Sequence, residues 1–461
     1  MTANQRYFLV GIGGSGMMPL AMILAGRGAS VAGSDRSLDQ GRVPAKFDAL
    51  RALGVTLHPQ DGSGITAPDQ IVVASAAVEE TVADLVTATR LGCPRLTRAE
   101  LNARLFNASA LPIGVAGTSG KSTVTGMIAA ILHAAGGDPT VMNGAVMKDF
   151  ASADRPFASA LVGRGDAYVS EVDESDGSIA LYAPRIAVLN NVSLDHKSLE
   201  ELNRLFAAFI GKAAHAIVNI DNPDAAALAL ALPRDRVTRF AIDRAADLQA
   251  TDVVEEPFAA SFSLGGTRVR LAVPGRHNVA NALAAIGAAL AAGIPLDQAI
   301  AGIERFTGLK RRFDLVGSAG GVAVIDDFGH NPDKIAATLD TLHAFPGRLL
   351  LLFQPHGYGP LKVMRRELIA MFAAKLAPGD RLVMPDPVYQ GGTVTREVTS
   401  ADIVGDIAIA GGDARHIPDR DAAAAALVAE AAPGDRIVVM GARDDTLPLL
   451  AQRMVEMLGA R

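Results

Sequence analysis

The chain has 461 residues, of which 49% are apolar and 20% are charged, and its net charge is −6. This composition excludes wholesale disorder, and the length suggests roughly three domains. The negative charge argues against a broad electrostatic grip on nucleic acid, and the single cysteine, Cys93, excludes an intrachain disulfide and a cysteine-rich zinc site.

Residues 7–25, YFLVGIGGSGMMPLAMILA, are apolar enough to suggest a signal peptide or a membrane span. A signal peptide needs a basic start, a compact apolar core and a small-residue cleavage site. This run instead has four glycines in six positions after a strand-like YFLV. We therefore predict a glycine loop of a soluble protein.

Short β-rich runs alternate with helical stretches along the whole chain, which predicts an α/β fold with mainly parallel sheets. Three blocks are expected, at 1–108, 109–308 and 309–461. The predicted strand runs are 7–12, 30–35, 70–75, 111–117, 167–172, 185–191, 215–220, 321–327, 348–354, 380–386 and 435–441.

The first glycine loop has a GxGxxG pattern at Gly11, Gly13 and Gly16, between a strand and a helical stretch. Such glycines let the backbone approach a pyrophosphate at a helix N-terminus. Asp35, at the end of the next strand, is a candidate acceptor for ribose hydroxyls. The pattern predicts a nucleotide diphosphate, and NAD, FAD and a UDP-sugar all remain possible.

A second glycine loop spans residues 114–127, GVAGTSGKSTVTGM. It ends like a P-loop, but Val115 stands where the first P-loop glycine is expected. We predict an anion nest at the start of an amphipathic helix that begins at Ser122. Lys121 would neutralise the β- and γ-phosphates, and Ser122 sits where a P-loop hydroxyl binds Mg²⁺.

Acidic side chains follow this loop. Glu171, at a strand end, begins a cluster with Asp173, Glu174 and Asp176, and oxygen ligands of this kind suit Mg²⁺. At the end of the next strand, Asp195 precedes His196, which we interpret as a second metal ligand oriented by a carboxylate.

A helix is predicted to open within residues 274–285, PGRHNVANALAA. His277 and Asn281 are four residues apart and share a helix face, so they suit the edges of adenine. Helix capping by Asn278 is the alternative interpretation.

Seven motifs together resemble the Mur ligase family, in order and at suitable spacing over nearly the whole chain. They are GTSGKST from Gly117, EVDESDGS from Glu171, NNVSLDH from Asn190, PGRHNVANALAA from Pro274, RRFD from Arg311, IDDFGHNP from Ile325 and FQPH from Phe353. The resemblance implies three domains: a Rossmann-like UDP-sugar domain (1–108), a central P-loop-type ATPase domain (109–308) and a Rossmann-like amino-acid or ligase domain (309–461).

The resemblance also implies roles for single residues. For ATP it implies Gly117, Thr118, Gly120, Lys121, Ser122, Thr123, His277, Asn281, Arg312 and Asp327. For the metal it implies Ser122, Glu171 and His196. For the UDP-sugar it implies Gly13, Ser15, Gly16, Asp35 and Ser75. For the incoming amino acid and the reacting carboxyl it implies His330 and His356, and the catalytic set is Lys121, Glu171, His196 and His330.

The implied reaction is an ATP-dependent amide ligation that uses Mg²⁺ and joins an amino acid to UDP-N-acetylmuramate through an acyl phosphate. Members that add L-alanine in peptidoglycan synthesis are the most similar. The resemblance further implies a bacterial cytoplasmic enzyme, a monomer or homodimer, acting on small molecules without nucleic acid or membrane insertion.

The sequence departs from the alanine-adding pattern near the expected amino-acid site. An arginine is expected after FQPH, but Gly357 follows, and Lys362 or Arg365 could substitute for it. A tripeptide-adding recycling enzyme or a paralogue with another substrate therefore stays open. Outside the family, a dinucleotide-dependent oxidoreductase built on the Gly11 loop and a UDP-sugar sensor without catalysis are the alternatives.

Overall fold

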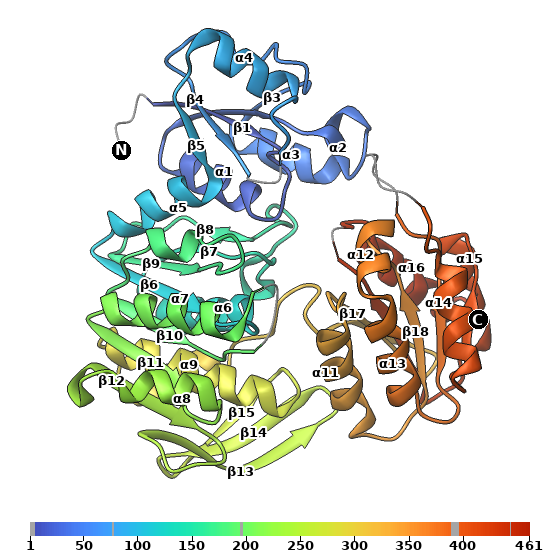
Figure 1. The fold of residues 1–461 in the computed structure, drawn as a ribbon. Helices are drawn as coiled ribbons and strands as arrows, with labels where there is room; N and C mark the ends of the chain where they lie inside the picture. The colour runs from blue at the N-terminus through green and yellow to red at the C-terminus, as the bar shows by residue number, and fades with distance from the viewer. Residues whose placement is uncertain (1–4, 76–77, 194–196, 389–395, 443) are drawn as a thin grey trace. The chain divides into compact units, whose positions relative to one another are not determined.

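The computed structural model describes residues 5–75, 78–193, 197–388, 396–442 and 444–461 (Figure 1). The chain divides into two compact units. The first contains residues 1–255 and 259–308, and the second contains residues 256–258 and 309–461. The first unit holds two of the three sheets formed by the described residues, and the second unit holds the third.

The first sheet is parallel, with strand order β3-β2-β1-β4-β5. The order reverses between β1 and β4, and such a switch point leaves a crevice at the carboxyl ends of the strands. Its strands are β1 (Arg6–Val10), β2 (Ser30–Ser34), β3 (Thr56–His58), β4 (Ile71–Ala74) and β5 (Arg95–Thr97). The accompanying helices are α1 (Met17–Gly26), α2 (Arg36–Asp39), α3 (Pro44–Ala52), α4 (Ala83–Leu91) and α5 (Arg98–Asn107).

The apolar run at residues 7–25 therefore becomes strand β1, a glycine loop and the ten-residue helix α1, as predicted. Within the described ranges, no helix is long and apolar enough to cross a membrane.

The second sheet has strand order β15-β14-β13-β12-β11-β10-β6-β9-β7-β8. Its strands are β6 (Leu111–Ala116), β7 (Thr140–Met142), β8 (Ala160–Leu161), β9 (Ala167–Glu171), β10 (Ile186–Leu189), β11 (His215–Asn219), β12 (Val237–Ala241), β13 (Leu248–Glu256), β14 (Ala259–Leu264) and β15 (Thr267–Leu271). The α-helices are α6 (Lys121–Ala134), α7 (Leu199–Lys212), α8 (Pro223–Leu230), α9 (Arg276–Ala291) and α10 (Leu296–Ile303). Short 3₁₀ turns are η1 (Lys148–Phe150), η2 (Ser178–Leu181) and η3 (Arg234–Arg236).

Helix α6 differs from its prediction. It begins at Lys121, and every residue from Val124 to Leu132 is buried, so the expected amphipathic helix is wrong. The reason is tertiary: α9 and α10 pack against α6, which also contacts strands of the sheet. A helix covered on all sides reads as apolar all round. The helix that begins at the second glycine loop is thus fixed within the core.

The second unit contains a six-stranded sheet of order β16-β17-β21-β18-β19-β20, parallel except for β16. Its strands are β16 (Asp314–Ala319), β17 (Val322–Asp327), β18 (Leu349–Phe353), β19 (Arg381–Met384), β20 (Ala414–His416) and β21 (Arg436–Met440). Its helices are α11 (Pro332–His343), α12 (Tyr358–Val363), α13 (Arg365–Lys375), α14 (Ser400–Ile409), α15 (Arg420–Glu430) and α16 (Leu447–Gly459). Separate apolar clusters cover its two faces, one with α11, α13 and α14 and the other with α15 and α16.

All eleven predicted strand runs contain strands of the structure. The prediction missed the hairpin β14–β15, whose strands pair in an antiparallel ladder, and the strands β12, β13 and β16, of which β13 has nine residues. It also missed five strands of two or three residues, namely β3, β5, β7, β8 and β20.

Candidate active site

Three neighbouring strands end at one edge of the second sheet. β6 lies between β9 and β10 and runs parallel to both, with Val115 opposite Glu171 and Ala116 opposite Leu189. The glycine loop after β6, Glu171 at the end of β9 and Asn190 after β10 therefore meet at the carboxyl edge, where parallel sheets bind ligands.

Asparagine side chains hold the second glycine loop in shape. The backbone N–H of Ser119 donates to Oδ1 of Asn191 at 2.8 Å, and Nδ2 of Asn190 donates to the Ser119 carbonyl at 3.1 Å. Nδ2 of Asn190 also donates to Oδ1 of Asn281 at 2.8 Å. Gly120 has φ +84°, and a Cβ there would lie 2.4 Å from Nδ2 of Asn190. Glycine is therefore required by both conformation and space.

The loop directs two polar side chains toward acids on β9 and the segment after it. Nζ of Lys121 donates to the Gly117 carbonyl at 2.8 Å and to Oε2 of Glu174 at 2.9 Å. Oγ of Ser122 donates to Oε2 of Glu171 at 2.8 Å. The predicted phosphate-binding lysine and the two oxygen ligands thus lie in one cluster at the start of α6.

Thr118 fixes the start of the loop and Thr123 lies in the first turn of the helix. Oγ1 of Thr118 donates to the Ser193 carbonyl at 3.1 Å and accepts from the Ser193 N–H at 3.0 Å. Thr123 is half-buried. Asn143, which sequence analysis did not select, donates from Nδ2 to the Ser122 carbonyl at 2.9 Å.

The acidic cluster after β9 divides into two kinds of residue. Asp173 and Asp176 accept hydrogen bonds from the backbone N–H groups of Ser175 and Ser178, so they shape the turn. Burial favours a higher pKa for Asp173, but the Ser175 hydrogen bonds and the Lys121 charge outweigh it and lower the pKa. Glu174, which is buried, instead pairs with Lys121.

The proposed adenine residues differ in their surroundings. His277 is exposed at the start of α9, whereas Asn281 is 3% exposed. Asn281 uses both ends of its amide within the protein, because Nδ2 donates to Oδ1 of Asn278 at 3.0 Å. The geometry therefore gives Asn281 a support role for the glycine loop. Asn278 bonds the Pro274 carbonyl at 2.7 Å. Asp195 and His196 lie outside the described residues.

A metal site is compatible with the oxygen pair at Ser122 and Glu171. Mg²⁺ prefers oxygen ligands and usually completes its coordination with phosphate and water, so two protein oxygens 2.8 Å apart are a suitable partial set. The described residues contain no group of three or more His, Cys, Asp or Glu side chains placed to hold a metal without such help.

The first glycine loop is tied to Asp35. One carboxylate oxygen accepts from the Gly13 N–H at 2.8 Å and the other from the Ser37 N–H at 2.8 Å. A Cβ on Gly13 would lie 3.0 Å from that carboxylate, which explains the glycine. The loop follows β1, while Asp35 and Ser75 follow β2 and β4. The sheet order therefore brings the candidate UDP-sugar residues to one edge.

Other features of the first loop are a buried lysine and an exposed serine. Nζ of Lys46 donates to the Gly13 carbonyl at 2.9 Å, a contact that no sequence motif indicates. Ser15 is exposed, and a Cβ on Gly16 would lie 2.9 Å from Cδ of Arg98.

In the second unit, the guanidinium carbon of Arg312 lies 4.4 Å from the ring centre of Phe328. Asp327 accepts from the backbone N–H groups of Phe313 and Gly329, both at 2.8 Å, so its carboxylate shapes the surrounding loops. The rings of His330 and His356 lie edge to face with centres 5.4 Å apart. The structure thus brings the two predicted histidines together.

Beside these groups lies a buried pair that the sequence analysis missed. Arg311 donates to the Gly441 carbonyl at 2.6 Å and to the Asp444 carbonyl at 3.0 Å, and its Nε lies 3.5 Å from Oδ2 of Asp326. Burial raises the pKa of Asp326 to about 7, with the nearby Arg311 charge opposing the rise.

Lys362 and Arg365, the two candidate substitutes for the missing arginine, pair with acids. Nζ of Lys362 lies 2.5 Å from Oε2 of Glu397, and Nη2 of Arg365 lies 2.6 Å from Oδ2 of Asp406. Gly357, which stands at the arginine position, has φ +144°.

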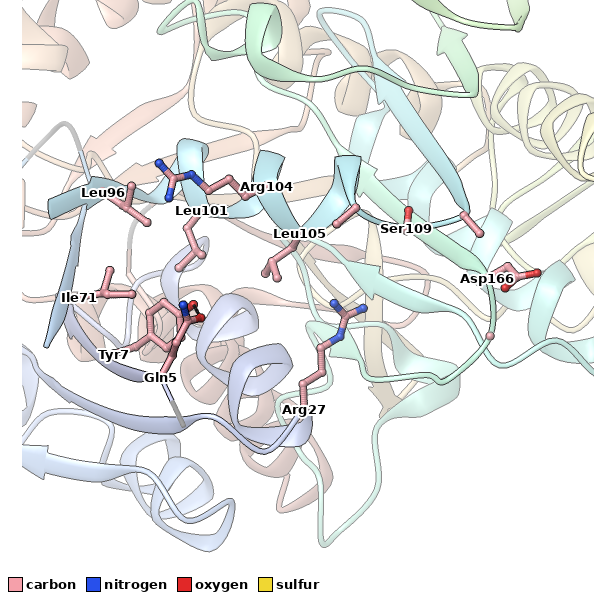
Figure 2. Close-up of a pocket in the computed structure, with 13 residues that line it drawn as sticks. Gln5, Tyr7, Arg27, Ile71, Leu96, Leu101, Arg104, Leu105, Ser109 and Asp166 are labelled. Atoms are coloured by element: carbon pink, nitrogen blue, oxygen red, sulfur yellow. Dashed lines mark hydrogen bonds between the residues drawn. The ribbon is translucent and has the colours of Figure 1, made fainter. Parts of the chain in front are cut away.

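A pocket of about 430 Å³ lies elsewhere, at the amino edge of the first sheet. Figure 2 shows Leu101 and Leu105 of α5 pointing toward Tyr7 of β1, and Arg27 and Asp166 also line the space. Because β1 begins at this pocket and ends at the first glycine loop, the pocket and that loop lie at opposite edges of the first sheet.

Sequence reasoning missed Asn190, Asn191 and Glu174 as parts of the phosphate-loop cluster. A signal for the asparagines was present, because both follow a strand that parallel pairing can place beside the glycine loop. No comparable sequence signal indicated which of the four clustered acids pairs with Lys121.

Three family models match successive parts of the chain. They are described as Mur ligase family, catalytic domain (residues 6–110), Mur ligase middle domain (residues 115–289) and Mur ligase, glutamate ligase domain (residues 311–443).

The chain is also similar to curated proteins over nearly its full length. It is 36% identical to UDP-N-acetylmuramate–L-alanine ligase of Streptomyces coelicolor, over 96% of each chain. It is 37% identical to the ligase of the same name from Mycolicibacterium vanbaalenii, over 96% of this chain and 94% of the relative.

Among solved structures, UDP-N-acetylmuramate–alanine ligase of Thermotoga maritima matches with a TM-score of 0.81 and 23% identity, over 99% of each chain. A murein peptide ligase of Psychrobacter arcticus matches with a TM-score of 0.72 and 23% identity, also over 99% of each chain. These two likenesses support the three-domain fold.

Proposed function

We infer that this chain, which belongs to the Mur ligase family, is an ATP-dependent ligase that joins L-alanine to UDP-N-acetylmuramate in peptidoglycan synthesis. The observation that carries the chemistry is the cluster of Lys121, Ser122, Glu171 and Glu174 at the ends of β6 and β9. The observation that carries the substrate is full-length identity of 36–37% to two ligases of that name.

The proposed reaction has two steps. A lactyl carboxylate oxygen of UDP-N-acetylmuramate attacks the γ-phosphorus of ATP, which gives an acyl phosphate and ADP. The neutral amino group of alanine then attacks the acyl carbon, and the tetrahedral intermediate collapses to the amide with loss of phosphate and a proton. Phosphoryl transfer of this kind requires positioning and charge neutralisation more than a protein nucleophile.

The roles proposed for the central residues follow from their contacts. The Thr118 N–H donates to the Asn191 carbonyl at 3.2 Å, so in this proposal the anion is met by the backbone N–H groups at the start of α6, next to Gly117 and Gly120. Lys121 contributes a positive charge that contacts the loop at the Gly117 carbonyl. Ser122 and Glu171, with His196, would hold Mg²⁺, which supplies charge neutralisation on the phosphate oxygens when bound.

Five further residues are proposed for nucleotide binding. Thr123 lies in the first turn of α6, and His277 and Asn281 lie on α9. Arg312 and Asp327 are proposed as the ATP-binding residues of the second unit.

The first sheet is proposed to bind the UDP-sugar. Gly13, Ser15 and Gly16 line the loop after β1, and Ser75 follows β4 at the switch point. Asp35 already bonds the Gly13 N–H, so it holds the loop open toward a diphosphate as well as offering its remaining lone pairs to a ribose. His330 and His356 are proposed to face the incoming amino acid.

The alternatives fit less well. A dinucleotide-dependent oxidoreductase leaves the contacts of Lys121 and Ser122 without a purpose. A tripeptide-adding enzyme is the second candidate, because the arginine expected after FQPH is absent. We propose a cytoplasmic enzyme that acts on small molecules.

The test is phosphate release from ATP and Mg²⁺ with UDP-N-acetylmuramate, after addition of L-alanine, then other amino acids, then the murein tripeptide. Release with L-alanine is the expected result. Release with the tripeptide alone would assign the chain to recycling, and no release with any of them would contradict the proposed ligase.

A further inference from the structure

The ammonium group of Lys121 is already bound by the protein. It donates to the Gly117 carbonyl and to Glu174, and the side chains of Lys121 and Glu174 are 18% and 6% exposed. An ammonium has three donor hydrogens, so two are used. A phosphate that binds Lys121 strongly must therefore share it with Glu174 or displace that carboxylate.

The charge around the loop is negative. Lys121 faces the carboxylate of Glu174, and its charge also acts on Asp173. Glu171 adds a third carboxylate beside the neighbouring Ser122. The guanidinium of Arg98 also acts on Asp173, so among the described groups three carboxylates face two cations, and a free polyphosphate meets an excess of negative charge at the start of α6.

Glu174 is not needed to shape its own loop. The turn is held by the hydrogen bonds that Asp173 and Asp176 accept and by a backbone bond from the Gly177 N–H to the Glu174 carbonyl at 3.1 Å. The side chain of Glu174 instead binds Lys121, with Oε2 accepting a hydrogen bond from Nζ at 2.9 Å.

We propose that Glu174 is an internal competitor of the nucleotide phosphates for Lys121. Without nucleotide, the Glu174 carboxylate accepts a hydrogen bond from the Lys121 ammonium and keeps it at the loop. When a polyphosphate binds with its cation, the phosphate replaces Glu174 as the acceptor. Anions that arrive without Mg²⁺, and the ADP left after turnover, are bound weakly because they repel Glu174 and must replace it. The inference rests on the proposed ATP site and adds a residue that tunes nucleotide affinity.

The experiment measures ADP binding to the full chain by calorimetry, in EDTA and then with Mg²⁺. Glu174→Gln keeps an oxygen acceptor for Lys121 and removes one charge, so ADP binding in EDTA should tighten by about fivefold or more. Asp176→Asn is the matched control: it removes a charge from the same loop, keeps the acceptor for Ser178, and should leave binding unchanged within about twofold.

A double variant separates competition from simple repulsion. If Glu174 acts through Lys121, most of the gain from Glu174→Gln disappears in a Lys121→Ala background. An equal gain in both backgrounds, or unchanged or weaker ADP binding by Glu174→Gln in a folded protein, overturns the inference. Failure of the unaltered chain to bind ATP with Mg²⁺ instead overturns the proposed function.

Discussion

Two buried cation–carboxylate pairs of the described residues, Lys121–Glu174 and Arg311–Asp326, are built differently. In the central region, Nζ of Lys121 donates to Glu174 at 2.9 Å and to the Gly117 carbonyl of its own loop at 2.8 Å. In the second unit, Arg311 approaches Asp326 only to 3.5 Å, while its guanidinium is bonded to two carbonyls after β21.

The difference indicates which pair can open. Lys121 carries a mobile point charge that can exchange one anion for another, whereas the planar guanidinium of Arg311 is fixed by carbonyls and by its position 5.1 Å from the ring centre of Phe328. The first pair therefore suits ligand binding, and the second stabilises the strand ends that carry Arg312 and Asp327.

The largest expected effect comes from removing the exchangeable cation. Lys121→Ala should lower turnover by about a thousandfold or more, because charge stabilisation of the phosphoryl groups is lost, while UDP-sugar binding at the first sheet stays unchanged. Phosphate release measures the turnover, and calorimetry measures the binding of the UDP-sugar. Lys375→Ala, which breaks an exposed pair with Asp340, is the matched control. A wild-type rate would contradict the ATP-site assignment.

Removing the fixed cation should instead affect stability. At pH 8, above the pKa of about 7 for Asp326, Arg311→Met leaves the Asp326 carboxylate buried without a cation and leaves the carbonyls of Gly441 and Asp444 without their donor, so the second unit should lose about 3–5 kcal/mol. Scanning calorimetry measures the transition. Arg311→Met combined with Asp326→Leu should recover much of the loss, and an equally unstable double variant would show that the pair is not the cause.

The same pair predicts a pH dependence with a defined sign. Because the native pKa of Asp326 is raised to about 7, the native state holds a proton that the unfolded state releases at lower pH, so this group's contribution to stability falls as pH rises toward 7. Asp326→Asn does not titrate. The free energy of unfolding of Asp326→Asn minus that of the wild type should therefore increase by about 2 kcal/mol between pH 5 and pH 8, because the wild type loses stability over this range. A difference that is constant with pH would contradict the assignment.

Much of this site could be predicted from sequence because it lies at strand ends. Lys121, Ser122 and Glu171 follow strands that pair in parallel, so their contact follows from pattern and topology. The fold class and the predicted strand runs followed from the alternation of β-rich runs with helical stretches.

The remaining contacts depend on tertiary distance. Packing of α9 and β10 against the loop decides which of the four neighbouring acids contacts Lys121. The same packing brings Asn281 within hydrogen-bond distance of Asn190, 91 positions away in the sequence. The burial of α6 was mispredicted because helices far along the chain cover its polar-looking side. Arg311 and Asp326 were hidden in motifs that drew attention to Arg312 and Asp327.

The smallest expected effect concerns an exposed pair, which completes the comparison. Lys362 and Glu397 have side chains 51% and 59% exposed, so their attraction is screened and contributes at most about 1 kcal/mol. Lys362→Ala should change stability little. If Lys362 does not replace the missing arginine, the KM for L-alanine should also change less than about twofold, since less than 0.5 kcal/mol of binding is involved. A large rise in KM with unchanged stability would assign Lys362 to the amino-acid carboxylate, and the exposed pair would then resemble the exchangeable one at Lys121.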